Sequence, residues 1–554
     1  MKKILIILIS ATLFAACSKK LDKLLINPNG PTPESADADL YLTQAQLSFA
    51  GFFNTASSFG MELTRQIVFY GPTYVNGYSP ETFDGIWSTA YTGVIKHCDA
   101  LIPIADAQKK YVNVAMAKIM KAYTYMTLVD IFGDIPYTDA NQGTGNLNPT
   151  LTPGRDVYAA CITLLDEAIA DLGKTIGAYP GTRDLFYGAS NATGANRWKT
   201  VAKTLKLRAY LNTRLVDNTV TAKINALLTE NDLIDTDAED FEFKYGKKQA
   251  NPNNRHPRYN GNYTATGSAG DYLGTYFMWT LVQDKGQGDA NNDPRTRYYF
   301  YRQQTNYANV NENTINCYNQ PPPAHYPGTM PFCLLISGYW GRDHGDDSGI
   351  PPDGQYRTTV GVYPFGGRFD NNQGAAVSLN VGGNGAGIQP IWLSAFTEFI
   401  KAEAALMLGT AGNARTLLES GVRKSIAKVI AFPNVIGHPE TIPATRVPDA
   451  ARIDAYVAKV LARYDAATNN AGRLDVISKD YYIALWGNGV DAYNMYRRNN
   501  SPTDMQLALV PDPGNFMNSC LYPSVHVNRN LNGVQKASVA VQVFWDNHPP
   551  GSRK

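Results

Sequence analysis

The chain is short of charge, histidine and cysteine. Only 18% of its 554 residues are charged, against about 25% in an average soluble protein. Lys plus Arg number 50 and Asp plus Glu number 48, so there is no basic excess that would mark a nucleic-acid-binding protein. Seven histidines and six cysteines occur, with no CxxC pair. The sequence therefore contains neither a recognisable zinc site nor a disulfide scaffold.

Short catalytic signatures are also missing. HExxH, GxSxG and the phosphate-binding GxxxxGK[ST] pattern do not occur. Glycosidase carboxylates have no short signature, so a surface glycoside hydrolase on a helical scaffold stays open as the alternative. The prediction is a protein that is not an enzyme and that has no cofactor, with a structural calcium ion left open.

The amino terminus indicates the compartment. Residues 1–17 read MKKILIILISATLFAAC, a basic start followed by an apolar run shorter than the ~20 residues that span a bilayer. This pattern predicts a signal peptide over residues 1–16. The segment Leu13–Cys17 resembles a bacterial lipobox, which predicts lipidation of Cys17 and stable membrane anchoring. An ordinary secretory signal with a chance cysteine is the alternative. Residues 17–32 read as a tether.

Hydrophobic periodicity predicts a mostly α-helical fold. Helical patterns cover residues 81–102, 112–132, 156–172, 197–216, 391–408 and 414–430. Pro103 is expected to end or kink the first of these helices. Residues 391–430 resemble a tetratricopeptide-like helix hairpin, and 112–132 with 156–172 is a candidate for a second.

Composition divides the mature chain into three regions. Residues 33–239 form an N-terminal helical part, 240–388 an irregular loop-rich part, and 389–554 a C-terminal helical hairpin and tail packed with the rest as one unit. The middle region is rich in Asn, Gly, Tyr and Pro. So long an irregular stretch is usually functional surface, so we expect the ligand there.

The cysteines after Cys17 are odd in number. Cys98 and Cys161 lie in helical patterns and are expected to be buried thiols. Cys317 and Cys333 flank a Pro-rich loop and are the one pair considered for a disulfide.

Residues 341–349, GRDHGDDSG, form the densest polar cluster. Three interpretations compete: a ligand-binding or structural loop whose Asp side chains bond local backbone, a hard-cation site with Asp346 and Asp347 as weak candidates, or an acid/base pair. Residues 289–293 have calcium-like spacing, but Pro294 and Phe300 stand where an EF-hand needs Gly and Glu.

Aromatic loops complete the candidate site. Exposed rings on loops stack on sugars or receive peptide side chains, whereas buried rings anchor a loop to the core. We expect residues 339–347 to lie near the 70–78 loop or near Tyr298–Tyr301. Burial of the Trp340 ring, with Asp343, Asp346 and Asp347 bonded only to their own loop, would make the cluster structural. The predicted ligand-binding residues are Tyr70, Tyr74, Tyr78, Tyr298, Tyr301, Tyr339, Trp340, Arg342 and Asp343.

Several stretches together resemble the SusD/RagB family of outer-membrane lipoproteins. They are the lipobox, Phe132–Tyr137 (FGDIPY), Asp293–Arg295 (DPR), Ser337–Asp346 (SGYWGRDHGD), Lys401–Leu406 (KAEAAL), Tyr496–Arg498 (YRR), Leu521–Ser524 (LYPS) and Asn528–Asn530 (NRN). Each motif is weak alone, but their order and spacing cover nearly the whole chain.

This resemblance implies a helical, tetratricopeptide-like fold with an irregular ligand-binding part. It also implies an outer-membrane, cell-surface lipoprotein that binds glycans or peptides and delivers them to a SusC-like TonB-dependent transporter. Two positions depart from the pattern. Ser18-Lys19-Lys20 follow Cys17 where many surface-exported relatives have acidic residues, and His526 stands where relatives often have Glu.

Three functions are weighed from these observations. The leading one is a nutrient-binding lipoprotein with an oligosaccharide ligand, and peptide is the other ligand class. The second is the surface glycoside hydrolase, and the third is a structural lid without ligand specificity.

Overall fold

The computed structural model describes residues 37–554 except 268, 306, 308–309, 349–351 and 550. The predicted signal peptide, Cys17 and the tether lie outside the described residues. Among the described residues no helix has both the length and the apolar character needed to cross a membrane.

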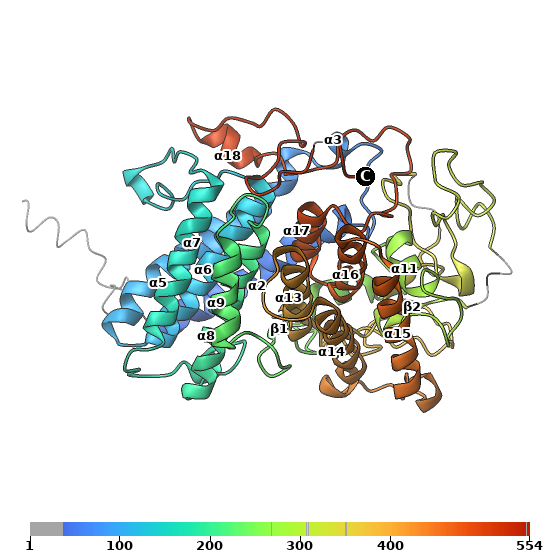
Figure 1. Ribbon diagram of the computed structural model, residues 1–554, viewed down its shortest axis with the longest axis horizontal. Coiled ribbons are helices and arrows are strands. Elements are labelled where there is room, and N and C mark those ends of the chain that lie inside the picture. Colours follow the sequence, from blue (N-terminus) through green and yellow to red (C-terminus); the bar gives the residue numbers. More distant parts are fainter. Residues whose placement is uncertain (1–36, 268, 306, 308–309, 349–351, 550) are drawn as a thin grey trace, which may run out of the picture.

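Helices dominate both ends of the fold (Figure 1). The N-terminal part contains α2 (Ala38–Leu63), α3 (Tyr74–Gly77), η1 (Pro80–Phe83), α4 (Asp84–Ser88), the π-helix η2 (Thr89–Ile95), α5 (Lys96–Ala107), α6 (Tyr111–Phe132), η3 (Gly143–Gly145), α7 (Gly154–Asp171), η4 (Gly181–Arg183), α8 (Ala192–Asn212) and α9 (Val220–Glu230). The C-terminal part contains α13 (Ser394–Leu408), α14 (Ala414–Val435), η6 (Ala444–Arg446), α15 (Ala450–Ala466), α16 (Asn470–Ala484), α17 (Gly489–Asn499) and α18 (Ser524–Arg529).

The middle region is irregular, as predicted. Its helices are short: α10 (Pro257–Asn262), α11 (Thr275–Val282), α12 (Thr296–Tyr299) and η5 (Ile336–Gly338). Two antiparallel pairs of strands cross it, β1 (Phe241–Lys244) with β4 (Ile388–Trp392), and β2 (Phe300–Arg302) with β3 (Thr358–Val360). Phe243 faces Gln389 in the first pair and Tyr301 faces Thr359 in the second.

Local sequence signals explain where the long helices begin and end. Asn and Asp side chains accept hydrogen bonds from the first-turn amides of six helices, and so satisfy donors that lack helical partners. These residues are Asp37, Asn191, Asn413, Asp449, Asn469 and Asn488. Gly409 ends α13 in the left-handed region, at φ 66°, a conformation that glycine adopts at low cost.

The predicted helix over 112–132 is confirmed as α6, and that over 156–172 as α7. Several boundaries were wrong. The helical stretch from residue 80 does not end at residue 102, because α5 contains Pro103 and continues to Ala107. Helix α8 ends at Asn212 rather than Val216. Helix α13 begins at Ser394, because the preceding apolar residues Ile388–Trp392 are buried in β4.

Helix pairs organise both ends of the molecule. In Figure 1, α13 and α14 lie side by side, and so do α6 and α7. Ala402 and Ala404 on α13 are fully buried, and small side chains allow close approach of paired helices. The two hairpins predicted from sequence are therefore confirmed.

Two clusters of buried apolar residues hold the structure together. The larger runs from Ala38 to Trp545 and joins both helical ends. Cys98, Cys161 and Cys520 are buried free thiols. The smaller cluster lies under the irregular loops and contains Val68, Tyr272, Val310, Ile315, Cys333 and Trp340. This small cluster positions the predicted site.

Candidate functional site

The predicted polar cluster lies on a backbone segment that hydrogen bonds join to two other segments. Arg342 N–H donates to the Leu273 carbonyl at 3.0 Å, and Gly345 N–H donates to the Phe69 carbonyl at 3.0 Å. Gly341 approaches so closely that an added Cβ would lie 2.0 Å from the Leu273 oxygen, which only glycine permits. The expectation that residues 339–347 lie near the 70–78 loop is confirmed.

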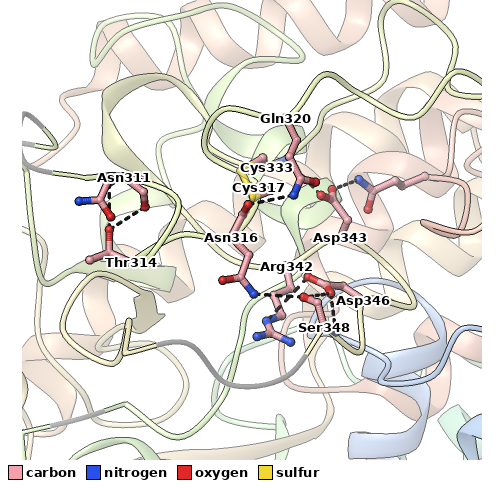
Figure 2. The surroundings of a disulfide bond; sticks show 11 residues. Asn311, Thr314, Asn316, Cys317, Gln320, Cys333, Arg342, Asp343, Asp346 and Ser348 are labelled. Carbon is pink, nitrogen blue, oxygen red and sulfur yellow. Dashed lines mark hydrogen bonds and ion pairs between the residues drawn. A yellow bond between two sulfur atoms is a disulfide. The ribbon is translucent and has the colours of Figure 1, made fainter.

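A disulfide joins Cys317 to Cys333, with the two Cα atoms 5.8 Å apart. The pairing considered from sequence is confirmed. Figure 2 shows that the bond brings Asn316 and Gln320 beside the loop that carries Arg342, Asp343 and Asp346.

A small cavity of about 90 Å³ lies at this point. We call it the disulfide pocket. It is lined by Asn316, Cys317, Gln320, Phe332, Trp340, Arg342, Asp343, Asp346, Ser348 and Leu509. Four of the residues predicted from sequence line this pocket. They are Trp340, Arg342, Asp343 and Asp346, the last of which was a weak candidate for metal binding.

Trp340 does not offer its ring to solvent. It is 2% exposed and packs edge-to-face on Tyr272, with 5.7 Å between ring centroids. Its backbone N–H donates to the Thr358 hydroxyl at 3.0 Å, and its carbonyl accepts from Thr358 N–H at 2.9 Å. The idea of Trp340 as an exposed platform is therefore wrong for this structure, because the ring fills the small apolar cluster.

Arg342 and Asp343 are also buried. The Arg342 guanidinium lies 4.2 Å from the Tyr272 ring centroid and 3.8 Å from the Asp346 carboxylate. Asp343 accepts hydrogen bonds from Cys333 N–H at 3.1 Å and from the Gln506 amide. Burial raises the pKa of Asp343 to about 7, although these two hydrogen bonds oppose the shift.

The acid/base interpretation of the cluster needs its carboxylates and its one imidazole, His344, to meet in one site. His344 instead bonds the Tyr74 hydroxyl through Nε2 at 2.9 Å and stacks on Phe69. It lines a different cavity from Asp343. Burial lowers the pKa of His344 well below its usual value, so the ring is neutral near pH 7. The geometry gives a structural histidine.

The acidic residues considered for a cation have other partners. Asp346 accepts from the Ser348 N–H at 3.0 Å and from its hydroxyl at 2.6 Å. Asp293 pairs with Arg295 at 2.6 Å, and Asp289 bonds two arginines. Within the described part of the chain, no group of three or more His, Cys, Asp and Glu is placed to hold a metal ion. Asp347 is exposed.

Tyr70 is the one predicted tyrosine with substantial exposure, at 46%. Its ring lies edge-on to Tyr272 at 6.4 Å, and Tyr272 also contacts Trp340 and Arg342. Tyr70 is therefore linked through Tyr272 to two residues that line the disulfide pocket.

The other predicted tyrosines are buried, so the expectation that they present exposed rings is corrected. Their hydroxyls or rings have internal partners, which removes the reason for them to face water. Tyr74 bonds His344, Tyr78 donates to Glu62, Tyr298 packs on Phe369, Tyr301 donates to the Ala375 carbonyl, and Tyr339 packs against Arg302.

Sequence reasoning missed several residues of this surface. Asn316 and Gln320 line the pocket, and Tyr318, which lies between them in the sequence, is 40% exposed. Only their proximity to Cys317 in the sequence could have indicated them. Ser348, from the predicted polar cluster, also lines the pocket. We define the pocket face as the exposed Tyr70, Tyr318, Gln320 and Ser348, the half-buried Asn316 and Asp346, and the buried Arg342.

Family models match two long stretches of the chain. Residues 29–322 match the SusD-like family described as "Starch-binding associating with outer membrane". Residues 376–543 match the family described as "Susd and RagB outer membrane lipoprotein". No curated protein sequence matches the chain significantly.

Solved structures share the fold over nearly the whole chain. A protein named as a chitin-binding protein is 19% identical, with TM-score 0.61, covering 92% of this chain and 100% of its own. A SusD/RagB family protein from Bacteroides thetaiotaomicron is 19% identical, with TM-score 0.65, covering 93% and 100%. A SusD homologue from Bacteroides fragilis is 17% identical, with TM-score 0.63 and the same coverage.

Proposed function

The chain belongs to the SusD/RagB family of outer-membrane lipoproteins, and from this premise we propose that it binds an oligosaccharide and delivers it to a SusC-like TonB-dependent transporter. The observation that carries the ligand class is the match of residues 29–322 to a family described as starch-binding. The structural neighbour named as a chitin-binding protein supports the same class.

The pocket face supplies chemistry that suits a sugar. Tyr70 offers an aromatic plane for the apolar face of a ring. The amides of Asn316 and Gln320 and the Ser348 hydroxyl can exchange hydrogen bonds with sugar hydroxyls. The cavity beneath is only about 90 Å³, so the ligand lies across an open surface. Ordering a ligand and side chains on an open surface costs conformational entropy, so we expect micromolar or weaker affinity.

The pocket geometry favours binding over glycoside hydrolysis. Both oxygens of Asp343 accept hydrogen bonds from Cys333 and Gln506. Asp346 is held by Ser348 and Arg342. A hydrolase needs one carboxyl free to protonate the leaving group and a second free to act on the sugar or on water. Neither carboxyl here has that freedom, so we infer a binding protein.

Calorimetric titration with maltooligosaccharides and chitooligosaccharides tests the ligand proposal. We expect saturable binding of at least one series, and Tyr70→Ala is expected to weaken it by about 1–2 kcal/mol, as for other aromatic contacts at binding surfaces. Tyr179→Ala is the matched control, because Tyr179 is also exposed, at 37%, but lies between α7 and η4. Absence of binding to either series, or equal loss in both variants, would count against the proposal.

Membrane fractionation tests the anchor and the partner together. Wild-type protein is expected in the outer-membrane fraction and, after gentle detergent extraction, in a complex with a large β-barrel transporter. Cys17→Ala is expected to be released from membranes, because the lipid on that thiol supplies the anchoring energy. Membrane retention of the variant contradicts the lipidation proposal, and a wild-type protein recovered without any barrel contradicts the transport proposal.

A further inference from the structure

A second cavity, of about 210 Å³, lies where the C-terminal segment packs on the N-terminal helices. We call it the Trp87–His526 pocket. Trp87 on α4 and Tyr91 on η2 line one side, and His526 and Arg529 on α18 line the other. Helix α18 lies at the top of Figure 1, far along the chain from the helices beneath it. The pocket shares no lining residue with the disulfide pocket.

The pocket is held by hydrogen bonds between segments far apart in sequence. The Tyr522 hydroxyl donates to the Asp134 carbonyl at 2.8 Å, and the Asn530 amide donates to the Pro149 carbonyl at 2.8 Å. The Tyr91 hydroxyl donates to the Pro136 carbonyl at 2.7 Å. The motifs at 132–137 and 521–530 therefore meet here, and the walls are fixed before any ligand arrives.

Aromatic rings form the buried wall. The Trp87 ring centroid lies 5.0 Å from that of Tyr91 and 5.1 Å from that of His526. Trp87 and Tyr91 keep 8% and 9% of their surface exposed. A cavity of this size is smaller than the roughly 300–1,000 Å³ typical of sites for drug-sized ligands. It suits a single six-membered ring packed against the aromatic wall.

Two side chains at the pocket have a nitrogen without a hydrogen-bond or ion-pair partner among the described residues. His526 is 5% exposed, and its Nε2 atom has no hydrogen-bond partner among the described residues. An unsatisfied buried polar atom costs free energy, and the ring that carries this atom lines the pocket. Arg529 is exposed at the rim and makes no ion pair with any residue that the structure describes. The amide N–H groups of Asn141 and Asn530 are already bonded to backbone carbonyls.

The charges of His526 and Arg529 indicate the charge of a ligand that would bind here. Burial lowers the pKa of His526, so the ring is neutral near pH 7 and Arg529 supplies the positive charge. Guanidinium groups bind carboxylates with strong, charge-assisted hydrogen bonds. The apolar wall and the cation at its edge therefore fit a ring that carries one acidic group.

We propose that the Trp87–His526 pocket binds one carboxylate-bearing six-membered ring, with the ring against Trp87 and Tyr91 and the carboxylate at Arg529. Two sources share this chemistry, a uronic-acid unit of a polysaccharide and an aromatic carboxylate. The uronic-acid source rests on the proposed function, since it makes the pocket a second contact for an acidic glycan.

Ligand-observed NMR and calorimetry with three probes test the proposal on the full mature protein. The probes are methyl α-D-galacturonoside, 3-phenylpropanoate and neutral methyl α-D-glucoside. At least one carboxylate probe is expected to bind saturably and more tightly than the neutral sugar, and the one that binds identifies the source. Arg529→Gln is expected to weaken this binding about tenfold, the effect of losing one charge-assisted contact.

Controls separate this pocket from other sites. Arg155→Gln is the matched variant, because Arg155 is also an exposed arginine at a largely apolar cavity, between α7 and α8. It is expected to leave the affinity unchanged. Tyr70→Ala is expected to weaken oligosaccharide binding without affecting the carboxylate probes. Both arginines are exposed, so neither substitution threatens folding.

Several results would overturn the proposal. These are no saturable binding of either carboxylate, equal binding of the neutral sugar, or equal effects of Arg529→Gln and Arg155→Gln. A further result that would overturn the proposal concerns Leu147 and Leu531, which are 72% and 90% exposed near the rim of the Trp87–His526 pocket. If the probes fail and Leu531→Asp abolishes transporter association, the pocket belongs to a protein-docking surface. Oligosaccharide binding that survives such failures leaves the proposed function standing.

Discussion

Trp340→Ala is expected to lower the free energy of unfolding by about 3–5 kcal/mol, the range for truncating a large buried aromatic side chain. The ring is 2% exposed and belongs to the small cluster under the irregular loops. The Cys317–Cys333 disulfide and the Trp340–Thr358 backbone contacts hold the surrounding chain. The loops therefore cannot collapse fully into the space that the indole leaves. Denaturant unfolding and amide hydrogen exchange over residues 310–348 measure the effect.

Trp340→Phe is the matched control. It keeps an aromatic ring in the cluster, and the indole Nε1 has no hydrogen-bond partner among the described residues, so no such bond is lost. A cost of about 1 kcal/mol is expected from the smaller volume. An alanine variant that unfolds like the wild type but loses oligosaccharide affinity would contradict the structural role and restore Trp340 as a ligand platform.

The helices were predictable where one apolar stripe repeats over several turns. Helix α6 matches its predicted range within one residue because apolar residues recur at three- and four-residue steps from Ala115 to Val129, and Gly133 ends the helix. Helix α2 was not predicted, although Phe49, Phe53 and Ala56 carry the same spacing. The start of α13 was misplaced because a fully buried strand such as Ile388–Trp392 and a buried helix share the same continuous apolar pattern.

The position of the 339–347 segment was predictable from the sequence, but the solvent exposure of the predicted tyrosines was not. The sequence predicted that the 339–347 segment lies near the 70–78 loop or near Tyr298–Tyr301, and the hydrogen bond between His344 and Tyr74 bears out the first alternative. Tyrosine is compatible with either side of a surface, since its ring packs and its hydroxyl finds water or an internal partner. Which partner it finds depends on contacts with segments far along the chain, such as that between Tyr301 and Ala375. Sequence patterns carry no signal for those contacts.

Glu403→Ala is expected to lower the free energy of unfolding by about 3–5 kcal/mol, the cost of breaking a buried ion pair from one side. Glu403 on α13 is 1% exposed. Arg498 binds it through Nε at 2.7 Å and Nη2 at 2.6 Å, and Arg214 Nε lies at 2.9 Å. Burial alone would raise the pKa of Glu403, but the two guanidinium groups outweigh it and hold the pKa at about 2. Alanine leaves both guanidinium groups buried without a countercharge.

Glu419→Ala is the matched control for Glu403→Ala. Glu419 pairs with Arg423 at 2.9 Å one turn along α14, but the two side chains are 33% and 41% exposed. Solvent screens such a pair, so a loss below about 1 kcal/mol is expected. The double variant Glu403→Ala/Arg498→Ala is expected to lose less unfolding free energy than the sum of its single variants. Each single variant leaves one buried charge without its partner, and the double variant removes both charges.

This ion-pair network also indicates a structural role for two of the motifs that resemble the family. Glu403 lies in the 401–406 segment and Arg498 in the 496–498 segment, and together with Arg214 they join α13, α17 and the end of α8. Their role is therefore to hold the helical parts together, and none of the three lines the disulfide pocket. Glu403→Ala protein that remains folded at low temperature is expected to bind oligosaccharide with wild-type affinity. A Glu403→Ala loss as small as that of Glu419→Ala would contradict the buried network, and a selective loss of ligand affinity would place these motifs in ligand binding instead.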